Sequence, residues 1–201
     1  MKNDDPCRWA SFHATFLSPG YARLYLKWNW RLPVLKPSAA VSLLCHQVER
    51  ASRFLNLPVI LENVPPPPDP DGLCNYDNYP ELLGQVIERT GCGLLLDLGH
   101  ARIAANQTHL PVYDYLDRLP LEKTRQIHIS GPRLRNGALY DAHQPLVDED
   151  YRLLEWALAH TDPEVVTLEY YQEKEPLRQQ LTRLAAMLAQ SSLAKVGLEI
   201  F

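Results

Sequence analysis

The sequence predicts an α/β protein built around a parallel β-sheet. Short apolar runs such as 92–98 (CGLLLDL) alternate along the chain with longer amphipathic segments such as 148–160 (DEDYRLLEWALAH). This alternation is typical of consecutive βαβ units, whose strands lie parallel. The runs are apolar at nearly every position, as expected when both faces of a sheet are covered.

Five strands and five helices follow this pattern in order. The strands are expected at 8–13, 58–63, 92–98, 125–130 and 164–169. The helices are expected at 38–56, 79–90, near 111–118, 148–160 and 174–190. Loops are expected at 64–72, which is rich in proline, between the strand at 92–98 and the helix near 111–118, and at 131–143. The last residues of the tail 191–201 form either one more short strand or a packed end. A doubly wound sheet or part of a TIM-type barrel satisfies this order, with right-handed crossovers.

Length and composition indicate a single domain over residues 1–201. A chain of 201 residues with 46% hydrophobic residues is long enough for one core and short for two. A net charge of −4 and a pI of about 6 argue against nucleic acid as a partner. The N-terminus has no apolar signal core, and no run is long enough to span a membrane. The four cysteines form no CxxC pair, so we expect reduced thiols in a cytoplasmic protein.

Each predicted strand ends at or near a carboxylate or an imidazole. In parallel α/β folds, the carboxyl ends of the strands lie on one face, where ligands bind. We therefore expect eight side chains from these ends and the loops after them to converge. They are His13, Glu62, Asp97, His100, His128, Asp141, His143 and Glu169.

Four histidines and four carboxylates in one pocket predict bound cations, because such groups would otherwise repel and desolvate one another. One ion takes three or four protein ligands, so eight indicate two or three ions. A nitrogen and oxygen donor set without cysteine suits iron, manganese or zinc. An extended backbone would place Asp141 and His143 on the same side. Glu62 is taken as the ligand and Asn63 as a supporting residue beside the ligands.

A single acid at a strand end is usually a turn or a helix cap, and a single histidine is usually structural. We accordingly treat His46, His109 and His160, which have no partner pattern, as structural. The metal hypothesis depends on the coincidence at five strand ends.

At these residues the sequence resembles the multinuclear non-haem iron oxidases typified by MbnB and TglH, within the xylose-isomerase-like TIM-barrel superfamily. The resemblance covers about residues 6–185, and its motifs are SFH at 11–13, ILEN at 60–63, RTGCGLLLDLGH at 89–100, IHISG at 127–131, DAH at 141–143 and TLE at 167–169. It implies a TIM-barrel-like fold and a site of two or three irons, with zinc or manganese as alternatives. It also implies O₂-dependent oxidation of a cysteine in a ribosomally made precursor peptide, as in natural product biosynthesis, with a small partner protein.

The resemblance further implies an incomplete barrel of about five βα units. The predicted strand at 8–13 would correspond to the family's fourth strand, so three strands and one family histidine have no counterpart here. A partner chain, a second copy of this chain, upstream residues or the C-terminal tail would then cover the open edges.

Two other functions are compatible with the sequence. One is a metal-dependent hydrolase or isomerase similar to endonuclease IV or the sugar isomerases, which also draw ligands from strand ends. The other is a non-catalytic, peptide-binding relative. The aromatic segment around Trp28 and Trp30, and the segment with Arg133 and Arg135, are candidate substrate or partner contacts.

Overall fold

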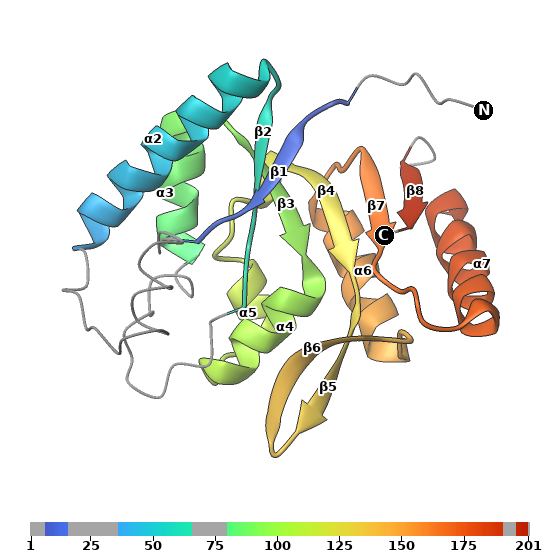
Figure 1. The fold of residues 1–201 in the computed structure, drawn as a ribbon. Coiled ribbons are helices and arrows are strands. Elements are labelled where there is room, and N and C mark those ends of the chain that lie inside the picture. Colours follow the sequence, from blue (N-terminus) through green and yellow to red (C-terminus); the bar gives the residue numbers. More distant parts are fainter. Residues whose placement is uncertain (1–6, 16–35, 66–79, 191–195, 201) are drawn as a thin grey trace.

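The computed structural model describes residues 7–15, 36–65, 80–190 and 196–200, and this part of the chain contains a six-stranded parallel sheet (Figure 1). The strand order is β1-β2-β3-β4-β7-β8. These strands are β1 (Ala10–His13), β2 (Val59–Glu62), β3 (Gly93–Asp97), β4 (Thr124–Ile129), β7 (Val165–Leu168) and β8 (Gly197–Ile200). The segment around Trp28 and Trp30 lies outside the described residues, as does most of the proline-rich loop.

Helices follow the strands as the sequence predicted. They are α2 (Pro37–Leu55), α3 (Pro80–Thr90), α4 (Leu98–Gln107), α5 (Val112–Leu116), α6 (Asp148–His160) and α7 (Lys174–Gln190), with a short 3₁₀ helix at Leu121–Lys123. Along the chain a helix follows each of the strands β1, β2, β3, β4 and β7, in the case of β4 after the strands β5 and β6, so the predicted α/β class with five βα units is confirmed. The tail forms β8, which pairs in parallel with β7, as one of the two alternatives for it had predicted.

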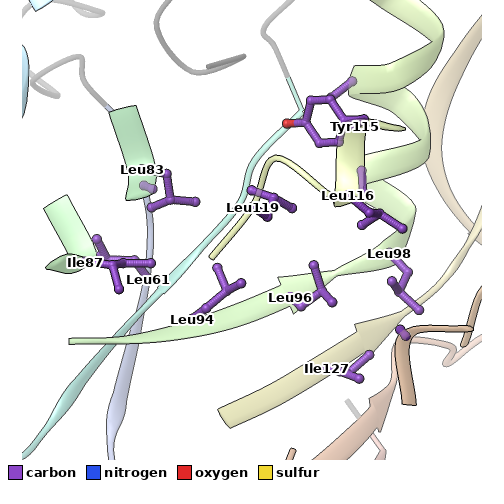
Figure 2. Close-up of a cluster of buried hydrophobic side chains, with 14 of the residues drawn as sticks. Leu61, Leu83, Ile87, Leu94, Leu96, Leu98, Tyr115, Leu116, Leu119 and Ile127 are labelled. Carbon is purple, nitrogen blue, oxygen red and sulfur yellow. The ribbon is translucent and has the colours of Figure 1, made fainter. Parts of the chain in front are cut away.

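Alternate strand residues pack against the helices and form the main core. Leu61, Leu94, Leu96 and Ile127 lie in one cluster with Leu83 and Ile87 of α3 and Leu116 of α5 (Figure 2). The strand residues in this cluster are at most 1% exposed. Their removal from water supplies the main driving force for docking the helices, at about 25 cal/mol per Å² of apolar surface.

The other set of alternate residues faces away from this cluster and includes the strand-end groups. Ser11, Ile60, Leu95 and Gln126 belong to it, because partners in parallel register point to the same side of a sheet. Among the described strands, β1 and β8 each pair with one neighbour and not with each other. The sheet therefore has two edges and is an open part of a barrel within this region.

Two elements differ from the predictions. Residues Leu98–Gln107 form α4 directly after β3, where a loop was expected. The segment after β4 is an antiparallel hairpin, with β5 (Gly131–Arg135) and β6 (Ala138–Gln144), where a loop was also expected. Its turn places Asn136 and Gly137 at φ values of 52° and 83°, a pair of left-handed residues that joins twisted strands well.

Two further observations concern the helices and the cysteines. None of the helices in the described ranges has the length and apolar character needed to cross a bilayer. Cys7, Cys45 and Cys92 are free thiols in the described part of the chain.

Candidate metal centre

The carboxyl ends of the strands deliver the eight predicted side chains to one edge of the sheet. His13, Glu62 and Asp97 are the last residues of β1, β2 and β3, and the register pairs His13 with Glu62 and Asp97 with His128. Glu169 directly follows β7. The other members come from α4 and the hairpin, namely His100, Asp141 and His143.

The first half of the cluster centres on Glu62. Its Oε1 lies 3.2 Å from Nδ1 of His100, and its Oε2 lies 3.4 Å from Nε2 of His13. Oδ2 of Asp97 lies 3.6 Å from Nδ1 of His100. The other oxygen of Asp97 accepts a 2.7 Å hydrogen bond from the backbone N–H of His100, so this carboxylate also caps α4.

The second half joins β4, β6 and the end of β7. Nε2 of His143 lies 2.9 Å from Oδ2 of Asp141. Glu169 lies between two histidines, with Oε1 3.0 Å from Nδ1 of His128 and Oε2 3.7 Å from Nδ1 of His143. The β5–β6 hairpin, which was predicted as a loop, therefore carries Asp141 and His143 to the sheet.

The two halves form one continuous cluster. Nε2 of His100 lies 3.7 Å from Oδ2 of Asp141. One ligand atom each from Glu62, Asp97 and His128 lies within 4.8 Å of the others. The side chain of Asp97 is fully buried, whereas that of His13 is 61% exposed, so the cluster runs from the interior to an open rim. A continuous chain of contacts thus links all eight predicted residues.

Asn63 holds the first half together. Its side chain accepts from the backbone N–H of Asp97 and donates to the carbonyl of the same residue, both at 2.9 Å. The carbonyl of Asn63 lies 2.9 Å from Nδ1 of His100. A carbonyl only accepts, so Nδ1 of His100 carries a proton and Nε2 is the nitrogen available for a ligand.

The two arginines singled out in the sequence lie on the hairpin. Arg133 is half-buried and donates to the backbone carbonyls of Pro132 and Pro145, so it stiffens the base of the hairpin. Arg135 is exposed at the end of β5, beside the turn.

Mutual electrostatics shift the pKa values inside the cluster. Burial alone would lower the pKa of His100, but the charge of Asp97 and hydrogen bonds to Asp141 and Glu62 raise it to about 11. Burial alone would raise the pKa of Glu62, but hydrogen bonds from His100 and His13 lower it to about 2. Burial raises the pKa of Asp97 to about 7. Protons on the histidines therefore neutralise the acids, and a bound cation would replace those protons.

The backbone at His143 differs from the extended conformation that the sequence analysis assumed. Its φ is 45°, in the left-handed region that residues other than glycine seldom adopt. The side chain nevertheless faces Asp141. Such strain persists only where surrounding contacts impose it, and it concentrates at functional sites.

The donors present fit a metal ion. Oδ2 of Asp97, Nδ1 of His128 and Oδ1 of Asp141 are buried without a hydrogen-bond partner, although Nδ1 of His128 is close to Glu169. Buried polar atoms are nearly always satisfied, so three unpartnered donor atoms at one site are suited to bind a ligand. Imidazole and carboxylate donors suit iron, manganese and zinc.

Three polar residues beside the cluster were not among the site residues predicted from the sequence. Nε2 of Gln126 lies 3.1 Å from Nε2 of His128 and donates to Oγ1 of Thr167, and its Oε1 accepts from Trp9. The spacing of two between Gln126 and His128 along β4 is a signal that could have identified Gln126. Trp9 has no comparable local signal, because its contact spans 117 residues of sequence.

The sequence is similar to known proteins over most of its length. The sequence model of the family described as "RiPP precursor modification enzyme MbnB/TglH/ChrH" matches residues 6–191. A UPF0276 protein of Bordetella parapertussis is 32% identical over 170 residues, covering 80% of this chain and 58% of that protein. A UPF0276 protein of Caulobacter vibrioides is 28% identical over 171 residues, covering 83% of this chain and 59% of that protein. This chain spans about three fifths of the length of these relatives. The chain therefore belongs to the MbnB/TglH/ChrH family of RiPP precursor modification enzymes.

Proposed function

We propose that this chain is a non-haem iron enzyme that uses O₂ to oxidise a cysteine in a ribosomally made peptide. The observation that carries the proposal is the joined cluster of four histidines and four carboxylates at the strand ends. Family membership supports a peptide as the substrate. A small partner protein that presents the peptide, and a cytoplasmic location where free thiols persist, belong to the same proposal.

Six of the eight proposed ligands fall into two groups that would each hold a metal ion, and the other two, His13 and Glu169, contact Glu62 and His128 of the first group. Glu62, Asp97 and His128 would hold one ion, since their donor atoms lie within 4.8 Å of one another. Asp141 and His143 would hold a second ion together with Nε2 of His100, the nitrogen that Asn63 leaves available. Bound iron would supply the one-electron redox chemistry that side chains lack.

The residues around the cluster control access and protonation. The fully buried Asp97 lies at the closed end, which excludes water from that side. His13, with Asp141 and His143 at 29% and 25% exposure, lines the open rim, so a peptide thiol would approach from there. Asp141 is the acid of the rim, and its Oδ1, the oxygen without a hydrogen-bond partner, would accept the thiol proton.

The first test is the metal content of protein purified without oxygen. Elemental analysis, followed by Mössbauer spectroscopy, should find two or more irons per chain. Asp97→Ala and His143→Ala should each lose at least one ion while remaining folded. His46→Ala, which removes an exposed imidazole of α2, is the matched control and should keep all of its metal.

The alternatives predict different results. Zinc or manganese as the native metal would favour the hydrolase or isomerase function. Absence of metal even after reconstitution would favour a non-catalytic, peptide-binding protein. With iron present, a cysteine-containing peptide encoded nearby should change mass and consume O₂, whereas the same peptide with serine in place of cysteine should do neither.

A further inference from the structure

A second polar unit lies beside the metal cluster and reaches across the sheet. Trp9, just before β1, donates through Nε1 to Oε1 of Gln126 on β4 at 2.9 Å. Nε2 of Gln126 donates to Oγ1 of Thr167 on β7 at 2.9 Å and lies 3.1 Å from Nε2 of His128. Because β2 and β3 lie between β1 and β4, the Trp9 bond spans the face of the sheet that carries the cluster (Figure 1).

The direction of the Gln126 amide is set by Trp9. An indole nitrogen has a hydrogen to donate and no lone pair to accept with, so it requires an oxygen opposite it. Oε1 of Gln126 therefore faces Trp9, and the amide NH₂ faces Thr167 and His128. Turning the amide over would place its NH₂ opposite the indole N–H of Trp9. Two donors would then face each other, and the hydrogen bond between Trp9 and Gln126 would be lost.

The amide direction and the carboxylate of Glu169 together set the tautomer of His128, because the NH₂ can only donate to Nε2 and the carboxylate can only accept from Nδ1. An NH₂ group 3.1 Å from Nε2 requires that nitrogen to accept, so the neutral ring keeps its proton on Nδ1. Nδ1 is buried and faces the cluster, with Oε1 of Glu169 at 3.0 Å. The nitrogen that faces the candidate metal site thus holds the proton that a metal must displace.

We propose that Gln126, held by Trp9, is a positioning residue that keeps the ring proton of His128 on the nitrogen facing the metal site and so opposes metal loading there. A metal on Nδ1 moves the proton to Nε2, where it meets the NH₂ of Gln126. The amide must then turn over and give up its bond to Trp9. The predicted effect on metal affinity rests on the proposed metal centre. The position of the His128 proton is a property of the metal-free protein and does not depend on that proposal.

This arrangement predicts that weakening the unit raises metal affinity. Trp9→Phe frees the amide to turn over, and its affinity for Co²⁺ should rise about fivefold, the equivalent of one ordinary hydrogen bond. Gln126→Glu supplies an acceptor for Nε2–H, and its affinity should rise about tenfold or more. A merely structural role for either residue predicts a loss of affinity. Trp156→Phe, a change on α6 that does not contact Gln126, is the matched control and should leave the affinity unchanged.

The decisive measurement is ¹⁵N NMR of the histidine rings in metal-free protein at alkaline pH, with His128 assigned by comparison with His128→Asn. The wild type should show the proton of His128 on Nδ1. Gln126→Glu, which places an acceptor at Nε2 to compete with Glu169 at Nδ1, should show a mixture of tautomers. A proton on Nε2 in the wild type, or an unchanged tautomer in Gln126→Glu, overturns the inference. Lower Co²⁺ affinity in folded Trp9→Phe also overturns it. If the wild type has the expected tautomer but binds no metal, the proposed function fails, and so does the predicted effect on metal affinity. The assignment of the His128 tautomer would still hold in that case.

Discussion

His100 contacts three of the four carboxylates of the cluster, namely Glu62, Asp97 and Asp141. These contacts make it the principal proton holder of the metal-free site, with a pKa raised to about 11 from 6.5. Nε2 of His100 and the carboxylate oxygens around the ring are also proposed metal donors, whereas Nδ1 keeps its proton toward the carbonyl of Asn63. Protons and metal therefore compete at this residue, and the stability of the protein should register the competition.

We predict that metal-free protein loses stability as the pH rises from about 6.5 to 9. The folded state binds the His100 proton more tightly than the unfolded state does, so the stabilisation is complete below pH 6.5 and is lost as the pH rises toward 11. Asp97, with its pKa raised from 3.8 to about 7, acts in the same direction at lower pH. Urea unfolding at a series of pH values measures the effect.

His100→Asn is the control for this prediction. It removes the titrating ring, so the decline in the urea midpoint between pH 6.5 and 9 should become shallower. A midpoint in the metal-free wild type that is constant or rises over this interval would contradict the raised pKa of His100.

Some helices and strands can be predicted from the local sequence alone, and others cannot. The helices at 148–160 and 174–190 were predicted with the bounds that the structure has, because each is a long amphipathic segment with clear ends. α4 was missed because Asp97 both ends β3 and caps the helix, which leaves no loop residue as a boundary. The hairpin was missed although its Asn136-Gly137 turn is a strong local signal.

The hairpin matters for the site because β6 carries Asp141 and His143, so its turn offers a test at the element scale. Gly137 has a φ of 83°, and Gly137→Ala should destabilise the protein by about 1 kcal/mol and weaken metal binding. Gly84→Ala is the matched control. Gly84 lies within α3 with open space around it, so alanine there should stabilise the protein by about 0.5–1 kcal/mol.

Urea unfolding and Co²⁺ titration of both glycine variants measure these effects. If Gly137→Ala were as stable as the wild type and bound Co²⁺ equally well, the turn would not position Asp141 and His143.

At the scale of the whole molecule, one rule accounts for much of the site. Parallel strands bring their carboxyl ends to one edge, so a list of strand ends already names residues that prove to be neighbours, such as Glu62 and Asp97. The rule says nothing about curvature. The bond from Trp9 to Gln126 and the φ of 45° at His143 depend on how the sheet bends and how the hairpin folds back, and the sequence contains no local trace of either.

Because the proposed ligands come from β1, β2, β3, β4 and β6 and from α4 and the end of β7, metal binding should stabilise the entire sheet rather than one loop. A metal that binds only the folded state raises the free energy of unfolding by about 2.7 kcal/mol when its free concentration is one hundred times Kd. We therefore predict a higher thermal midpoint in the presence of metal, reversed by chelation. Asp97→Ala, at the buried end, should abolish most of the increase, and His13→Ala, at the exposed rim, should reduce it less. Metal that is bound by elemental analysis without any rise in the midpoint would mean that it binds elsewhere, because a ligand joining this many strands cannot leave their unfolding unchanged.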